Sequence, residues 1–237
     1  MATFQGLIRK NIVNANVQFE RLGYITNNIS NQNTTGYKSV RFEQILTEDG
    51  YLRGVVRNDH RPSILRVTDD KFDFGINGQG YIPVTSENGD VKYTRDGSMK
   101  QNKEGYLTTT DGYLIGDGIK LPINYSDFWI KSNGDVVVAK EFGDKPEKIG
   151  RIPIVNFQNP DGLKAVDGNK FIPTEDSGEP VLILNHDRME HQKLESSNNN
   201  TFAEVNEVMR LNASMLAGFQ MIKAINDMYD KSIKLQG

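Results

Sequence analysis

The two ends of the chain carry long, regularly spaced apolar stripes without proline, and this feature constrains the fold more than any other. Over residues 1–35 and again over 201–235, apolar side chains recur at steps of three and four. This spacing predicts an amphipathic helix at each end, with a period close to that of a coiled-coil seam. The stripe positions are Ile8, Ile12, Ala15, Phe19, Leu22 and Ile29 near the N-terminus, and Val208, Leu211, Met215, Ile222, Ile225 and Tyr229 near the C-terminus.

Polar residues mark the inner boundary of each predicted helix. The run Asn31–Gly36 is expected to end the first helix, because its side chains compete for backbone hydrogen bonds and glycine allows positive φ. At the second helix, Thr201 followed by Glu204 has the form of a capping box. The second helix is apolar on more than one side, which indicates more than one neighbour. The residues that widen it are Met209, Leu216, Phe219, Met221 and Met228.

The middle of the chain, roughly residues 70–185, has a different pattern. Short β-type runs alternate with turn signals, and no helical period lies between them. This pattern predicts an all-β sandwich or barrel-like domain. The expected strands are Phe72–Ile76, Tyr81–Thr85, Val91–Thr94, Val136–Ala139 and Ile152–Phe157, and the turns are Asn88-Gly89, Glu104-Gly105, Asp111-Gly112, Asp117-Gly118, Asn133-Gly134 and Asn159–Gly162.

Together these patterns predict an α+β chain in which the terminal helices pair as a coiled coil and an all-β domain is inserted between them. We expect residues 1–37 and 198–237 to form the helical part, 38–70 an extended connector, and 71–197 the β-rich part. Two such helices leave apolar surface unburied when they stand alone, so the surplus face predicts packing against other subunits. Contacts that repeat head-to-tail without closing generate filaments.

Composition and charge exclude several further classes of function. A formal net charge of −3 argues against a general nucleic-acid binder, and no stretch has the length of apolar sequence that a transmembrane helix needs. The N-terminal residues lack the pattern of a cleaved secretory signal. Cysteine is absent from the sequence, which excludes disulfides, thiolate metal sites and cysteine nucleophiles.

Candidates for catalysis or ligand binding are few. His186 and His191 are five residues apart, so they do not share a helix face as metal ligands would, and a polar connector explains them better. Gly75, Gly78 and Gly80 suggest a phosphate loop, but a strand rather than a helix follows them. The Asx-Gly pairs lack the closing acidic residue of a calcium loop. The sequence therefore predicts no enzyme activity, no cofactor and no metal.

Five segments carry a family resemblance, and they occur in the family's order across nearly the whole chain. The sequence resembles flagellar rod and hook proteins of bacteria in the segments Asn27–Lys38, Phe74–Tyr81 with Tyr93–Ser98, Glu104–Leu107 with Asp111–Tyr113, Asn156–Leu163 with Gly168–Phe171, and Glu195–Asn200. The motif turn of that family falls on Asn28, Asn31, Asn33, Thr34, Thr35, Gly36 and Tyr37.

The resemblance implies a structural subunit of the flagellar basal-body rod, which spans the periplasm and transmits torque from motor to hook. It implies export without a cleaved signal through the flagellar type III apparatus, then polymerisation with copies of itself and other rod and hook proteins. Terminal helices would line the inner tube, with the β domain outside and no insertion into membranes. The compact stretch 42–70 and the segment Gly116–Pro122 favour a proximal over a distal rod subunit.

One alternative remains open from the residues alone. Aromatic side chains of the β domain could form a stacking platform for a glycan or peptide, with the helices as an oligomerisation stalk. The same residues could instead pack a core or pair across strands, which we favour. The residues concerned are Tyr81, Tyr93, Tyr106, Tyr113, Phe128 and Trp129.

Overall fold

The computed structural model describes residues 4–141, 143–166 and 169–236, and the chain forms two compact units. The helical unit comprises Met1–Asn31, Val40–Asn58 and Asn199–Gly237. The β-rich unit comprises Gln32–Ser39 and Asp59–Asn198. The α+β class predicted from the sequence is confirmed.

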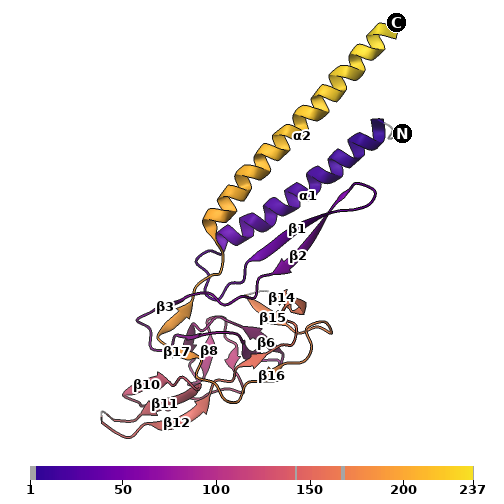
Figure 1. The fold of residues 1–237 in the computed structure, drawn as a ribbon. Helices are drawn as coiled ribbons and strands as arrows, with labels where there is room; N and C mark the ends of the chain where they lie inside the picture. The colour runs from indigo at the N-terminus through magenta and orange to yellow at the C-terminus, as the bar shows by residue number, and fades with distance from the viewer. Residues whose placement is uncertain (1–3, 142, 167–168, 237) are drawn as a thin grey trace. The chain divides into compact units, whose positions relative to one another are not determined.

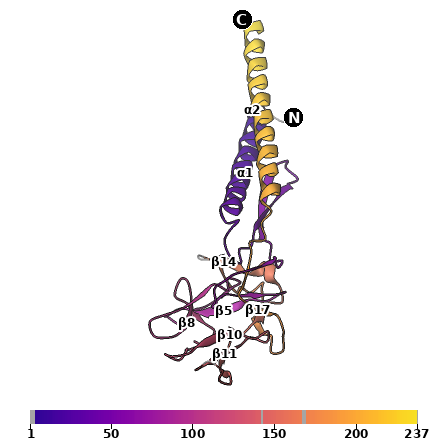
Figure 2. The same ribbon diagram turned by 90° about the vertical axis from the view of Figure 1, so that its left-hand side faces the viewer.

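The helical unit contains both terminal helices. α1 spans Phe4–Ser30 and α2 spans Thr201–Gln236. They run side by side in opposite directions, and α2 is the longer (Figures 1 and 2). The ion pair between Arg21 and Glu207, at 2.5 Å, joins them near their inner ends.

A β-hairpin completes the helical unit. β1 (Val40–Leu46) and β2 (Leu52–Asn58) pair antiparallel in the stretch expected to be a connector, and they lie against α1 (Figure 1). The ring of Tyr24 stacks on Phe42 at 5.5 Å, and Gly54 leaves room for that same Phe42 ring. Asp49-Gly50 between two alternating runs is a hairpin signal that could have identified these strands from the sequence.

The start of α2 differs in detail from the sequence expectation. Asn200, the residue before the helix, supplies a side-chain cap, because its Oδ1 accepts a hydrogen bond from the N–H of Ala203 at 3.1 Å. Glu204 does not reach back along its own helix; its carboxylate instead accepts a bond from the amide of Asn28 at 2.8 Å. The predicted start of the helix at Thr201 is confirmed, and Asn200 adds a cap that the sequence analysis did not name.

The β-rich unit is built from short antiparallel strands. Among the described residues they form a seven-stranded sheet in the order β14-β15-β6-β5-β9-β8-β7, a three-stranded sheet β10-β11-β12, and the pairs β13-β16, β17-β4 and β18-β3. The strands are β3 (Leu65–Val67), β4 (Phe74–Ile76), β5 (Ile82–Thr85), β6 (Val91–Thr94), β7 (Met99–Gln101), β8 (Leu107–Thr109), β9 (Leu114–Ile115), β10 (Asp127–Ile130), β11 (Asp135–Ala139), β12 (Glu147–Arg151), β13 (Val155–Asn156), β14 (Lys164–Val166), β15 (Lys170–Ile172), β16 (Val181–Leu182), β17 (Met189–His191) and β18 (Lys193–Glu195).

The core of this unit lies between the two larger sheets. Side chains on alternate positions of β10 and β11 point inward and meet those of β5, β7, β8 and β9. A second, aromatic cluster lies beside it and includes Tyr81, Phe157 and Phe171. The main cluster comprises Phe74, Ile76, Ile82, Val84, Met99, Leu107, Ile115, Ile119, Leu121, Phe128, Ile130, Val136, Val138, Ile152, Ile154 and Met189.

Turn chemistry in the β-rich unit agrees with the sequence expectation. The glycines of all five predicted two-residue signals have positive φ. The sixth signal forms a short 3-10 helix, η1 (Pro160–Gly162). Strands β4, β5, β6 and β11 fall within or beside their predicted runs, whereas Ile152 and Ile154 are buried outside any strand.

Candidate assembly surfaces

The structure divides the predicted apolar stripe between exposed and covered positions. Ile12 and Phe19 of α1 are 53% and 52% exposed, whereas Leu211 of α2 is buried. The side chains of Ile8 and Tyr229 lie outside the described residues. The remaining stripe positions are half-buried: Ala15, Leu22, Ile29, Val208, Met215, Ile222 and Ile225.

α1 buries a different face from the one that the stripe indicated. Val17, Ile25 and Asn28 are buried. At about 3.6 residues per turn, they lie on the far side of the helix from Ile12 and Phe19. The β1–β2 hairpin lies against α1, and this additional partner was not foreseen from the sequence. As a result, α1 is covered on one side within its own chain and leaves Ile12 and Phe19 open.

α2 carries a second apolar strip, which we call the outer strip. Its members are exposed in the single chain, with Phe202 at 79% and Leu216 at 62%. They lie on the opposite side of α2 from the buried Leu211, so α1 does not cover them. An apolar strip of this kind on a helix calls for a further neighbour. The outer strip consists of Phe202, Val205, Met209 and Leu216.

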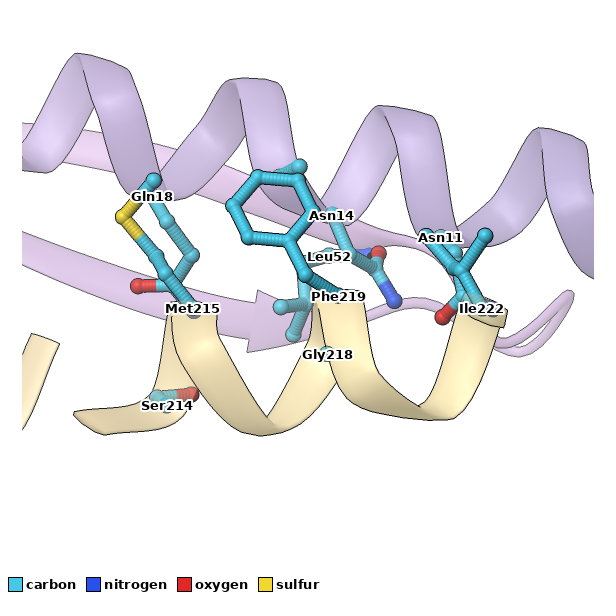
Figure 3. Close-up of a pocket in the computed structure, with 10 residues that line it drawn as sticks. Asn11, Asn14, Gln18, Leu52, Ser214, Met215, Gly218, Phe219 and Ile222 are labelled. Carbon is cyan, nitrogen blue, oxygen red and sulfur yellow. Dashed lines mark hydrogen bonds between the residues drawn. The ribbon is translucent and has the colours of Figure 1, made fainter. Parts of the chain in front are cut away.

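A groove of about 210 Å³ lies between the two helices and the hairpin (Figure 3). α2 contributes apolar side chains such as Met215 and Ile222, whereas α1 contributes the amides of Asn11, Asn14 and Gln18. A coiled-coil seam instead interlocks apolar side chains from both helices. The helices are thus paired, but along this groove their contact is mixed in polarity and open.

Asn28, from the family motif, joins three segments of the helical unit. Its Oδ1 accepts a hydrogen bond from the N–H of Val40 at 2.8 Å, and its Nδ2 donates to the Val40 carbonyl at 2.9 Å and to Glu204. The side chain of Asn199 donates to the Asn28 carbonyl at 2.8 Å. Burial raises the pKa of Glu204, and the bond from Asn28 opposes that rise. A single buried amide therefore ties the end of α1, the start of β1 and the start of α2.

The rest of the motif turn separates into two groups. Asn31 closes the end of α1 by donating to the Asn27 carbonyl at 2.9 Å. Within the β-rich unit, the Thr35 carbonyl accepts a bond from Asn169 at 2.8 Å. The N–H of Tyr37 donates to the Thr34 carbonyl at 3.3 Å, and Asn33 is exposed.

Gly36 has the positive φ on which its role depends. Its φ is +64°, and a Cβ placed there would lie 2.6 Å from the carbonyl carbon of Arg95. Its N–H donates to the Glu195 carbonyl at 2.8 Å. This position therefore requires glycine for two reasons, backbone conformation and close approach.

A buried ionic cluster lies next to Gly36 and was not predicted from the sequence. It consists of Lys38, Arg95 and Glu195. Lys38 Nζ lies 2.7 Å and Arg95 Nε 2.6 Å from the carboxylate of Glu195. Burial, together with the charge of Arg95, lowers the pKa of Lys38 to about 8, and Glu195 opposes that shift. Each of the three residues lies in a different segment of the family resemblance. This is the one sequence signal that could have grouped them.

The structure argues against a stacking platform made of the six aromatic residues. Of the six aromatic residues proposed as a platform, Tyr81, Tyr93 and Phe128 are buried in the core clusters. His191 contacts the Lys71 carbonyl through Nε2 at 2.6 Å. Among the described residues, no group of three His, Asp or Glu side chains could hold a metal ion. None of the described helices is long and apolar enough to cross a membrane.

Comparison with known proteins gives a consistent result. Residues 75–138 match the family model of the flagellar hook protein FlgE/F/G D1 domain. The chain is 33% identical over 183 residues to the flagellar basal-body rod protein FlgG of Caulobacter vibrioides, an alignment that covers 67% of this chain and 70% of that one. It is 29% identical over 240 residues to FlgG of Agrobacterium fabrum, covering 89% and 92%, and 30% identical over 185 residues to FlgG of Bacillus subtilis, covering 67% and 69%.

Proposed function

This chain belongs to the family of flagellar basal-body rod proteins, and on that premise we propose that it builds the rod by packing its helical unit against copies of itself and of related rod and hook proteins. It is a structural subunit of the basal body, and its relatives are named flagellar basal-body rod proteins. We assign it no catalytic role.

The observation that supports this packing most strongly is the outer strip of α2. Phe202, Met209 and Leu216 are mostly exposed in the single chain, on the side of the helix away from Leu211. Ile12 and Phe19 add an open apolar surface on α1. Burying such side chains against a neighbour stabilises by about 25 cal/mol per Å² of apolar surface removed from water. Packing between subunits covers these faces and leaves the β-rich unit, which has its own core, intact.

In the assembled rod, α1 and α2 are proposed to tighten into a coiled coil. The half-buried positions Leu22, Val208 and Ile225 supply its seam, and the groove beside Met215 and Ile222 closes as neighbouring subunits pack. The helical parts, 1–37 and 198–237, face the inner tube. The β-rich part, 71–197, is proposed to lie outside, and of the predicted connector, 38–70, the β1–β2 hairpin belongs to the helical unit.

Export is proposed to precede assembly. The chain would leave through the flagellar type III apparatus unfolded and fold outside, where its lack of cysteine avoids mispaired disulfides. Its place along the rod is proposed to be proximal, from the compact stretch 42–70. Electron microscopy of basal bodies from a deletion strain tests this assignment, since the point of truncation separates proximal from distal subunits.

The packing proposal is tested by replacing Leu216 with Asp. Because Leu216 is mostly exposed, the variant should fold and be exported as the wild type is, but a charge in a dry interface should block assembly and swimming. Leu216→Met, which keeps an apolar side chain of similar volume at the same position, is the matched control and should swim. Normal rods from L216D would contradict the proposal.

A further inference from the structure

The chain passes between its two units four times. The crossings fall after Asn31, Ser39, Asn58 and Asn198. On the side of the β-rich unit, they leave three segments whose ends must be fixed: 32–39, 59–63 and 195–198. If the three segments had no bonds to one another, each would become ordered on its own. If they are bonded to one another, they become ordered together.

The carboxylate of Glu195 contacts the other two segments and Arg95, the residue that follows β6. It is fully buried, and its Oε1 accepts hydrogen bonds from Lys38 Nζ at 2.7 Å and from the N–H of Ser63 at 2.8 Å. Its Oε2 accepts from Arg95 Nε at 2.6 Å. Lys38 Nζ also donates to the Arg61 carbonyl at 2.8 Å. One carboxylate thus holds a residue from each of the other two segments and Arg95, which directly follows β6.

Asn198 repeats the connection with neutral groups. Its Oδ1 accepts from the N–H of Ser39 at 2.7 Å, and its Nδ2 donates to the Asp59 carbonyl at 2.6 Å. The N–H of Asp59 in turn donates to the Ser39 carbonyl at 2.8 Å. Because these bonds form a closed ring across three segments, the loss of one member loosens the other two.

Arg95 anchors this arrangement in the β-rich core. Its guanidinium donates to the carbonyls of Gly80 at 2.5 Å, Gly78 at 2.8 Å and Ile76 at 3.2 Å. The side chain is almost wholly buried, so its charge depends on Glu195 and these carbonyls in place of water. The cluster holds two cations against one carboxylate, which makes Glu195 the member whose loss leaves the most uncompensated charge.

We infer that Glu195 and Asn198 form a clamp that locks the three exit segments of the β-rich unit into one cooperative joint. The clamp lies wholly within the β-rich unit, and it operates in the free subunit. It therefore goes beyond the proposed packing between subunits and does not depend on it.

Hydrogen–deuterium exchange on the full-length free subunit tests the clamp. In Glu195→Gln, the amides of 36–39, 59–63 and 195–198 should exchange roughly tenfold faster or more, all three segments together, while β5 and β11 change much less. Asn198→Ala leaves the ionic cluster untouched and should produce the same joint response. If E195Q fails to fold, N198A decides.

The matched control is Val84→Ala, which makes a small cavity in the buried strand β5. It should speed exchange in the seven-stranded sheet without singling out the three exit segments. The inference is overturned if N198A, or a folded E195Q, speeds only the amides bonded directly to the altered side chain. It is equally overturned if the three segments respond no more than β5 does. The exchange measurements on N198A and E195Q are made on the free monomer, so their result is independent of the assembly test with L216D.

Discussion

The two units of this molecule bury their apolar residues to very different extents. In the β-rich unit the main cluster places apolar side chains from two sheets in one closed core, with Phe74 fully buried. In the helical unit, Val17, Ile25 and Leu211 are buried, while Phe202 is 79% exposed. The β-rich unit thus satisfies its own apolar surface, and the helical unit leaves part of its surface for neighbours.

The units resemble each other in the way they hold their chain crossings. Each uses a buried polar hub at the segments that cross, but the chemistry differs. Asn28 does this with a neutral amide in the helical unit, and Glu195 with an ionic cluster in the β-rich unit. The β-rich unit has a complete core, which can hold a buried charge whose removal is strongly destabilising. The helical unit lacks its neighbours in the free subunit, and its neutral amide costs less free energy when it is exposed to water.

The largest expected effect comes from replacing one phenylalanine by alanine in each unit. Phe74→Ala should lower the free energy of unfolding by about 3–5 kcal/mol, because it leaves a cavity in a closed core. Phe202→Ala should change it by no more than about 0.5 kcal/mol. Urea unfolding followed both by the fluorescence of Trp129, the one tryptophan of the chain, in the β-rich unit and by far-ultraviolet circular dichroism for the helices measures the two losses. Equal losses would remove the contrast between the units.

A smaller effect is expected at Gly36. Gly36→Ala should destabilise the β-rich unit by about 2 kcal/mol or more, since it combines a strained φ with backbone atoms of Arg95 and Asp96 less than 3 Å from the new Cβ. Gly89→Ala is the control, because Gly89 also has positive φ but nothing lies within 4 Å of its Cβ position. It should cost about 1 kcal/mol. A G36A chain no less stable than G89A would show that the close approach has no effect.

The smallest effect concerns pH and His60. Burial lowers the pKa of His60 to about 4, and its Nδ1 lies 2.7 Å from the hydroxyl of Tyr81. The unfolded chain takes up this proton near pH 6.5 and the folded chain only near 4, so the contribution of His60 is complete above pH 6.5 and is lost as pH falls to 4. The surrounding charges that oppose or add to this shift are Asp161, Lys38, Asp59 and Arg95.

We expect that fall in pH to lower the free energy of unfolding through His60, because only the unfolded chain takes up the proton readily over that range. Other carboxylates titrate in the same window, so the measurement is the difference between wild type and His60→Phe in urea unfolding at pH 7 and pH 4. The variant should lose less stability than the wild type on acidification. Parallel losses would mean that His60 is not held neutral by its surroundings.

Much of the fold could be predicted from local sequence. Helix periodicity and Asx-Gly turns are local signals, so α1, α2 and the turns of the β-rich unit were foreseen. The hairpin was missed although Asp49-Gly50 signalled it, because its strands are half-exposed and resemble a connector. The buried cluster could not be derived, since Lys38, Arg95 and Glu195 are far apart in sequence and singly resemble surface charges. The hairpin determines which face of α1 is covered, so that face was missed together with the hairpin.

Limited proteolysis of the free subunit tests the central claim most directly. Trypsin sites are present in both units, for example Arg9 and Lys223 in the helices and the exposed Lys103 and Lys120 in the β-rich unit. An incomplete helical unit should open more often than a closed core, so brief digestion should remove α1 and α2 first and leave a fragment that retains 59–198. If the helices and the β-rich unit are cleaved at the same rate, the helical unit is complete on its own and the account is wrong.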